Sequence, residues 1–201
     1  MSESNNQSFI SEARREQIIQ ASIQTLDEIG FVKTSLARIA SKAHISTALI
    51  SYHFSDKIDL MNHVLTKLVE TSAAYISARV DSQKNATEKL IAFVEAGLAY
   101  QGTHHMNNSA LLEIIFNART PDNFPYYKLT GDEEDGDATY ALLCDILRSG
   151  QESKEFTKFH IQSVATFIQG AIGESMFVNA DRFDLETYSQ ELVRSVLKLV
   201  K

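Results

Sequence analysis

The sequence predicts an all-α protein of about nine helices. Apolar residues recur every three or four positions along most of the chain, and the alternation typical of strands is nearly absent. The chain has only 2 Pro, both between Thr120 and Tyr126, and no Trp. With 201 residues, of which 44% are hydrophobic and 22% charged, it can bury a substantial core as one compact unit or two coupled ones.

The first helix is expected from near Ser11 to Ile29, where Gly30 stops it. Two short helices joined by a tight turn follow between Thr34 and Lys57. Thr34 or Ser35 can cap the first of these helices, and Ser46 can cap the second after a break at residues 44–46. Such a pair shares only a small core, so the second helix keeps an exposed polar side that fits a major groove.

The later helices follow from caps and apolar periodicity. They are expected from a cap at Ser55 to residue 80, from a capping box at 85–88 to residue 100, from 107 or 108 to 118, over 138–149, over 158–178, and over 185–201 after a cap at Asp184. Residues 119–137 break the periodicity and are expected to form a surface loop. An EF-hand reading of its acidic cluster fails because aligning Gly136 with the invariant glycine places Gly131 and Leu142 at the first and twelfth ligand positions.

Charge is divided unevenly along the chain. Residues 1–57 contain six basic and six acidic side chains, whereas residues 58–201 contain 13 basic and 20 acidic ones. The later part therefore repels a phosphate backbone and leaves the N-terminal part as the docking face. We expect DNA binding that weakens steeply with salt but uses few ionic contacts per half-site.

DNA-facing residues follow from their positions in the helix pair. Side chains at the start of the second helix enter the groove first, Tyr52 and His53 lie at its far end, and Lys57 begins the next helix, where a phosphate is favoured. The expected DNA-binding residues are Thr34, Ser35, Ser46, Thr47, Ala48, Ser51, Tyr52, His53 and Lys57. For Tyr52 and His53 the alternative is mutual packing near Phe54, which is itself expected in the core.

The last two helices carry apolar stripes that either belong to the internal core or pair with a second copy of the chain. The candidate interface residues are Val164, Ile168, Ala171, Ile172, Met176, Leu192, Val196 and Leu199. Gly170, Ala171 and Gly173 would let two backbones approach closely. Periodicity alone leaves both readings open.

A group of aromatic and polar-tipped side chains in the middle of the chain either lines a ligand cavity or simply packs in the core. Its members are Phe93, Tyr100, His104, Met106, Phe116, Tyr127 and Phe167. No metal site is expected, because His104 and His105 are adjacent and point about 100° apart on a helix. No cofactor is expected either.

Catalytic and targeting motifs are missing from the sequence. No His has a Glu three residues before it, as a di-iron helical bundle would need, and no nucleophile elbow or phosphate loop occurs. We therefore do not expect an enzyme. The single Cys144 excludes an intrachain disulfide. We also find no signal peptide and no apolar run long enough to span a membrane, so we expect a cytoplasmic protein.

Residues from Arg14 to about Leu60 resemble the TetR-type transcriptional regulators. The motifs that carry the resemblance are Gly30-Phe31, Thr34-Ser35-Leu36, Ile39-Ala40, Ala43-x-Ile45-Ser46, Tyr52-His53-Phe54 and Lys57. The sequence departs from the family at two positions. His44 replaces the usual Gly of a turn that often needs positive φ, and Ser51 stands where many relatives have Tyr.

The resemblance implies a helix-turn-helix DNA-binding domain at residues 1–57 and a ligand-binding and dimerisation domain at residues 58–201. It implies a ligand-responsive regulator, and we expect a repressor that binds palindromic operator DNA as a homodimer until a small-molecule effector releases it. Two alternatives remain: a ligand-sensing helical dimer that does not bind DNA, and a helical-bundle enzyme.

Overall fold

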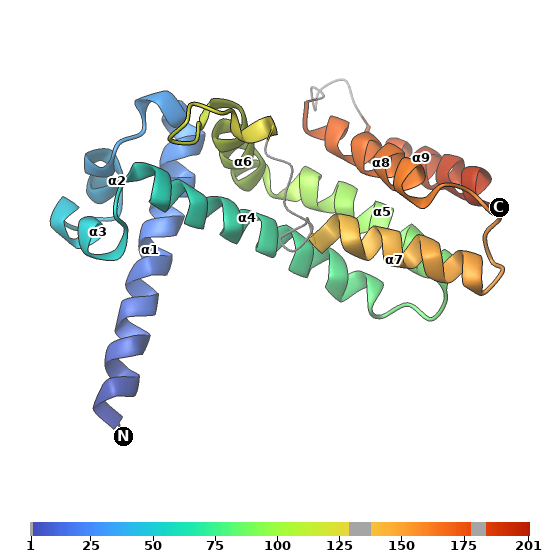
Figure 1. Cartoon of the computed structure of the whole chain (residues 1–201), viewed down its shortest axis with the longest axis horizontal. Coiled ribbons are helices and arrows are strands. Elements are labelled where there is room, and N and C mark those ends of the chain that lie inside the picture. Colours follow the sequence, from blue (N-terminus) through green and yellow to red (C-terminus); the bar gives the residue numbers. More distant parts are fainter. Residues whose placement is uncertain (1, 129–137, 178–183) are drawn as a thin grey trace. The chain divides into compact units, whose positions relative to one another are not determined.

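The computed structural model describes residues 2–128, 138–177 and 184–201, and within these ranges the chain forms nine α-helices and no strand (Figure 1). The predicted all-α fold is confirmed. The elements in chain order are α1 (Ser2–Lys33), α2 (Leu36–Lys42), α3 (Thr47–His53), α4 (Lys57–Val80), α5 (Ala86–Thr103), α6 (His105–Asn117), the short η1 (Tyr126–Lys128), α7 (Ala138–Glu152), α8 (Ile161–Glu174), η2 (Ser175–Phe177) and α9 (Leu185–Val200).

Several predicted helix starts are confirmed by their caps. The Asn85 side chain accepts a hydrogen bond from the Glu88 N–H, and Asp184 accepts one from the Glu186 N–H.

Four starts differ from the prediction. Helix α4 is capped by Asp56 rather than Ser55, since the Asp56 carboxylate accepts from the Asp59 N–H at 2.9 Å. Helix α6 begins at His105 rather than at residue 107 or 108. Helix α1 begins at Ser2 instead of near Ser11, and α8 begins at Ile161 because the His160 side chain caps it. Of the predicted loop, residues 119–128 form an isolated bridge and η1, while the acidic cluster lies outside the described residues.

Two compact units divide the described residues. The first contains residues 2–68 and 106–128, and the second contains residues 69–105, 138–177 and 184–201. The first unit therefore takes in α6, which the sequence assigned to the ligand-binding part. Compactness does not say which residues bind DNA, so a functional boundary after residue 57 stays a prediction.

The core of the first unit forms where α1, α2, α3, the start of α4 and α6 meet. Ile18, Leu26 and Ile50 are fully buried in it, and Phe54 is 2% exposed, which confirms that Phe54 is a core residue. Ser22 is also buried, and its hydroxyl donates to the Ile18 carbonyl 2.8 Å away. This intrahelical bond removes the cost of burying a hydroxyl in an apolar core.

The second unit is built around α5, which contacts α7, α8 and α9 (Figure 1). Its core buries most of the stripes that the sequence offered as a dimer interface. Val164, Ile168, Ile172, Leu192 and Val196 are at most 7% exposed. The prediction needs correction for these five residues, because their own chain covers them. Of the candidate set, Ala171, Met176 and Leu199 keep exposed surface.

We predict that Gly150→Ala lowers the free energy of unfolding by about 1–3 kcal/mol through overpacking. An added Cβ would overlap the Phe156 ring, and the Phe156 N–H is tied to the Gly150 carbonyl at 2.9 Å, so the ring has little room to withdraw. Urea denaturation followed by circular dichroism measures the change.

Ser149→Ala is the control for this prediction. Ser149 is the exposed neighbour of Gly150 in α7, so alanine there should gain only helix propensity, up to about 1 kcal/mol. Equal effects of the two substitutions would contradict the packing described for Gly150.

Candidate nucleic-acid interface

Helices α2 and α3 are seven residues each, and serine side chains cap both. The Ser35 hydroxyl accepts from the Arg38 N–H at 3.3 Å, and the Ser46 hydroxyl accepts from the Leu49 N–H at 3.2 Å. Ser35 rather than Thr34 is thus the cap of α2. The Ser46 cap is confirmed. Both caps satisfy N–H groups that a short helix otherwise leaves open.

The turn between α2 and α3 depends on a left-handed residue at its centre. His44 has φ 54°, which confirms that this position needs positive φ although no glycine occupies it. The turn closes with the Ile45 N–H donating to the Ala40 carbonyl at 3.0 Å. From α1, the Gln17 amide donates to the Ala43 carbonyl at 2.9 Å and holds the turn from outside.

Helix α3 is anchored along one side only. Ile50 is fully buried, and Phe54 at the C-cap is buried beside it. Arg15 of α1 holds the C-terminal end, since its guanidinium donates to the His53 carbonyl at 2.9 Å and lies 4.6 Å from the centre of the Phe54 ring. A positive charge at this end also interacts favourably with the negative pole of the helix dipole.

The opposite side of α3 is open to solvent, as the sequence predicts. Its exposed residues are Ser46, Thr47, Ala48, Ser51 and Tyr52. Tyr52 is 80% exposed, so it does not pack into the core, and its ring meets His53 edge-on with centroids 5.0 Å apart. The result is a polar surface with one projecting aromatic ring on a fixed helix.

Two of the nine expected DNA contacts are engaged inside the protein. Thr34 is 3% exposed and its hydroxyl donates to the Gly30 carbonyl at 2.7 Å, so burial removes it from any DNA surface. The Lys57 ammonium donates to the Phe31 carbonyl at 2.6 Å and lies 4.0 Å from the centre of the Phe31 ring. Burial lowers the pKa of Lys57 from its ordinary value. The prediction that Thr34 and Lys57 contact phosphates is therefore corrected: both side chains stabilise the backbone at Gly30 and Phe31 instead.

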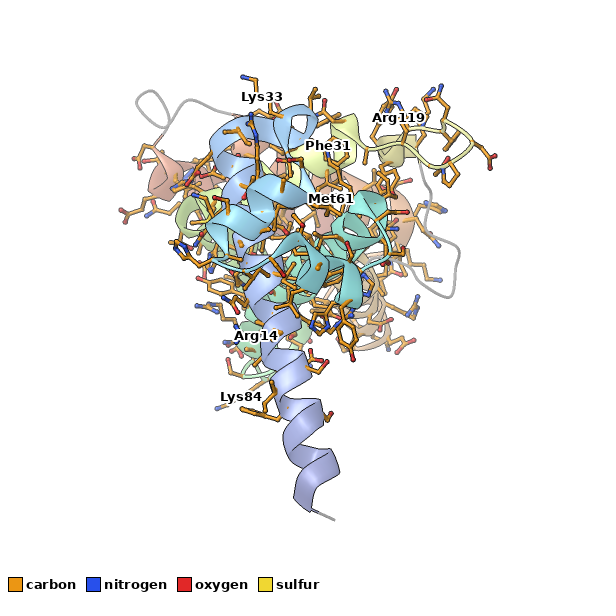
Figure 2. All side chains as sticks on the ribbon, turned by 90° about the vertical axis from the view of Figure 1, so that its left-hand side faces the viewer. Arg14, Phe31, Lys33, Met61, Lys84 and Arg119 are labelled. Atoms are coloured by element: carbon orange, nitrogen blue, oxygen red, sulfur yellow. The ribbon has the colours of Figure 1, made fainter. Side chains whose placement is uncertain are left out.

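Basic residues of the first unit are partly neutralised by their neighbours. Lys42 pairs with Glu28 at 2.6 Å, and Lys67 pairs with Glu16 at 3.0 Å. Lys33 and Arg38 are exposed and belong to no ion pair found among the described residues. Figure 2 shows Lys33 and Phe31 at the upper end of α1 and Arg14 near its lower, N-terminal part.

The predicted ligand-pocket residues have mixed environments. In the second unit, Phe93 and Tyr100 are buried and His104 stacks on Tyr100 with centroids 4.1 Å apart, whereas Phe167 is 54% exposed on α8. Exposure removes Phe167 from a cavity lining. Tyr75, which the sequence did not single out, meets both Tyr100 and His104 edge-on.

The other three pocket candidates belong to the first unit. Met106, Phe116 and Tyr127 are 42–50% exposed, and the rings of Phe116 and Tyr127 lie 6.1 Å apart. Among the described residues, no three His, Cys, Asp or Glu side chains come close enough to bind a metal ion. No described helix has the length and apolar character needed to cross a membrane.

The fold and the capped helix pair define a helix-turn-helix protein, the class in which a short second helix reads DNA. Residues 18–64 match the family described as "Bacterial regulatory proteins, tetR family". Over this segment, which holds the helix pair, the chain is similar to the TetR family of helix-turn-helix regulators.

Curated relatives match less than half of the chain. The HTH-type transcriptional regulator BetI of Stenotrophomonas maltophilia (strain R551-3) is 38% identical over 86 residues, which cover 41% of this chain and 42% of that protein. BetI of Burkholderia ambifaria (strain MC40-6) is 40% identical over 89 residues, covering 42% of this chain and 44% of that protein. The match thus spans less than half of these relatives. Both are named as transcriptional regulators.

Solved structures share the fold over nearly the whole chain. FadR from Bacillus subtilis in complex with stearoyl-CoA has a TM-score of 0.75 at 19% identity, covering 92% of this chain and 99% of that one. The ketosteroid transcriptional regulator KstR2 of Mycobacterium tuberculosis has a TM-score of 0.68 at 20% identity, covering 94% of this chain and 95% of that one.

We predict that His44→Gly raises the free energy of unfolding by about 0.5–1 kcal/mol, because glycine adopts positive φ without the steric cost that a side chain carries. Ser41→Gly is the control, since Ser41 is an exposed residue inside α2 and glycine should destabilise it. Thermal and urea unfolding of both variants measures the opposite signs. A loss of stability in His44→Gly would contradict a strained turn.

Proposed function

We propose that this chain is a ligand-responsive transcriptional regulator that represses by binding palindromic operator DNA as a homodimer. In this proposal α3 lies in the major groove, and a small-molecule effector lowers the affinity for DNA. One observation carries the proposal: α3 is anchored by Ile50 and Phe54 while its polar side faces solvent. A fixed helix with an open polar side is what reading base edges requires.

The DNA contacts follow from the order of residues on α3. Thr47 and Ala48 begin the helix and would enter the groove first, where the Ala48 methyl can meet a thymine methyl. Ser46, Ser51 and Tyr52 would donate hydroxyls to bases or phosphates. His53 is partly exposed at the far end.

Phosphate contacts come from the neighbouring elements. Ser35 is exposed at the start of α2, and we add Lys33 and Arg38 as exposed cations of the same unit. These residues lie within residues 1–57, which we propose as the DNA-binding part. Residues 58–201 would then provide effector binding and dimerisation, while α6 completes the core that supports the helix pair.

An effector site is proposed in the second unit near Phe93, Tyr100 and His104, with Tyr75 added from the structure. Buried rings at this place favour an apolar ligand. FadR from Bacillus subtilis was solved with stearoyl-CoA, and KstR2 is named as a ketosteroid regulator, so acyl-CoA thioesters and steroids are the first compounds to test. Because linkage is reciprocal, an effector that weakens DNA binding must itself bind less tightly when DNA is present.

We predict that Tyr52→Ala raises the Kd for DNA flanking the chain's own gene about tenfold, because one groove contact of roughly 1.4 kcal/mol is lost. Fluorescence anisotropy measures the Kd. Tyr127→Ala is the control, since Tyr127 is 50% exposed in the same unit but lies outside the helix pair. If the wild-type chain binds effectors but no DNA, the alternative of a sensing dimer without DNA binding replaces this proposal.

The homodimer surface is proposed on the exposed sides of α8 and α9 rather than on their buried stripes. Phe167 is 54% exposed and Leu199 is 47% exposed. Gly170 and Gly173 follow Phe167 on α8, and a Cβ added at either glycine would have no atom within 4 Å. Exposed apolar side chains next to glycines, which have no side chain to keep a neighbour away, allow two helices to pack closely.

We predict that Phe167→Glu raises the dimer dissociation constant about a hundredfold, because a buried carboxylate at an interface has no partner. Sedimentation equilibrium measures this constant. Phe116→Glu is the control, as Phe116 is 50% exposed but belongs to the first unit. A wild-type chain that sediments as a monomer, or equal effects of both substitutions, would rule out this surface.

A further inference from the structure

Phe31 joins the straight part of α1 to α2, and both of its backbone polar groups are held by charged side chains. Its N–H donates to the Glu113 carboxylate at 2.7 Å, and its carbonyl accepts from the Lys57 ammonium at 2.6 Å. Glu113 lies on α6 and Lys57 begins α4. We call these three residues the Phe31 clamp.

The backbone break at Gly30 makes the clamp possible. Gly30 has φ 73° and ψ 167° inside α1, so the helical ladder is interrupted and the next N–H is free to turn toward α6. A Cβ at Gly30 would lie 3.1 Å from the Glu113 Oε2 atom. The backbone conformation therefore favours glycine, and a side chain at this position would also crowd the carboxylate that lies against it.

The Phe31 clamp is largely shielded from solvent, and each backbone group of Phe31 faces a side chain of favourable charge. The Phe31 side chain is 8% exposed, and the Lys57 ammonium lies over its ring. On the other side, the Asn117 amide donates to the Glu113 Oε2 atom at 3.2 Å and helps to orient the carboxylate. An anion faces the N–H and a cation faces the carbonyl, which makes both hydrogen bonds charge-assisted and stronger than neutral ones.

A short series of hydrogen bonds connects the Phe31 clamp to the start of α2. The Thr34 hydroxyl and N–H both donate to the Gly30 carbonyl, and Ser35 then caps α2. Helix α2 in turn contacts α3. The direction in which α2 leaves α1 is therefore set at Phe31.

We propose that Glu113 is a positioning residue for DNA reading: from α6 it fixes Phe31 and thereby the placement of α2 and α3 on α1. The inference rests on the proposed DNA-binding function. Glu113 lies outside residues 18–64 that match the family, so it extends the DNA-reading machinery to a helix from a later part of the chain.

The test compares Glu113→Ala, Glu113→Gln and the control Glu95→Ala at a temperature where circular dichroism shows every variant folded. Glu95 is an exposed acid on α5, so its removal changes the net charge equally without touching the clamp. Glu113→Ala should raise the Kd for operator DNA about tenfold and leave non-specific DNA binding unchanged. Glu113→Gln keeps a neutral acceptor and should stay within about threefold of wild type.

Hydrogen exchange of the free protein, measured by NMR, supplies a readout that does not depend on DNA. The Phe31 amide should exchange at least about tenfold faster in Glu113→Ala than in wild type, and Glu95→Ala should leave it unchanged. Faster exchange with an unchanged operator Kd would overturn the positioning role. An unprotected Phe31 amide in wild type would overturn the clamp itself. If wild type binds no DNA while Phe31 remains protected, the DNA-binding function fails and the clamp is only a structural contact.

Discussion

Helices of seven residues do not persist alone in water, so α2 and α3 exist because the rest of the first unit holds them. The decisive interaction is the burial of Ile50 and Phe54 against that unit. It fixes which side of α3 is inside and, by exclusion, which side is outside. The polar surface that faces solvent is a consequence of this anchoring, and the proposed reading of DNA depends on it.

Polar contacts then fix the position of the turn between α2 and α3 and of the C-terminal end of α3, where apolar packing does not reach. Gln17 holds the turn through the Ala43 carbonyl, and Arg15 holds the end of α3 through the His53 carbonyl. Both side chains come from α1, which is therefore a scaffold for the pair. Basic residues near a DNA-binding helix are readily assigned to phosphates, yet Arg15 makes both of its observed contacts inside the protein.

Local features of this chain could be predicted from the sequence. The caps Ser46, Asn85 and Asp184 were correctly predicted because a cap is decided within three residues. The helix break at Gly30 and the positive φ of His44 also follow from residue type at a known spacing. Such signals locate the helix pair and the exposed side of α3.

Long-range contacts could not be predicted in the same way. Glu113 and Phe31 are 82 residues apart, and no periodicity relates a carboxylate on one helix to a single N–H on another. The dimer interface predicted from the apolar stripes of α8 and α9 was wrong for a related reason. An apolar stripe looks the same whether its own chain or a second copy covers it, and only the packing of α5 and α7 against these helices decides the matter.

The most direct test of the central claim is selection of bound sequences from a random pool of double-stranded DNA by the full chain. Two copies of α3 related by a twofold axis should enrich a palindrome whose half-site centres lie about 10 base pairs, or a multiple of that, apart. Mutating either half-site should then weaken binding equally. Enrichment of a single asymmetric site, or no enrichment above the starting pool, would contradict the account.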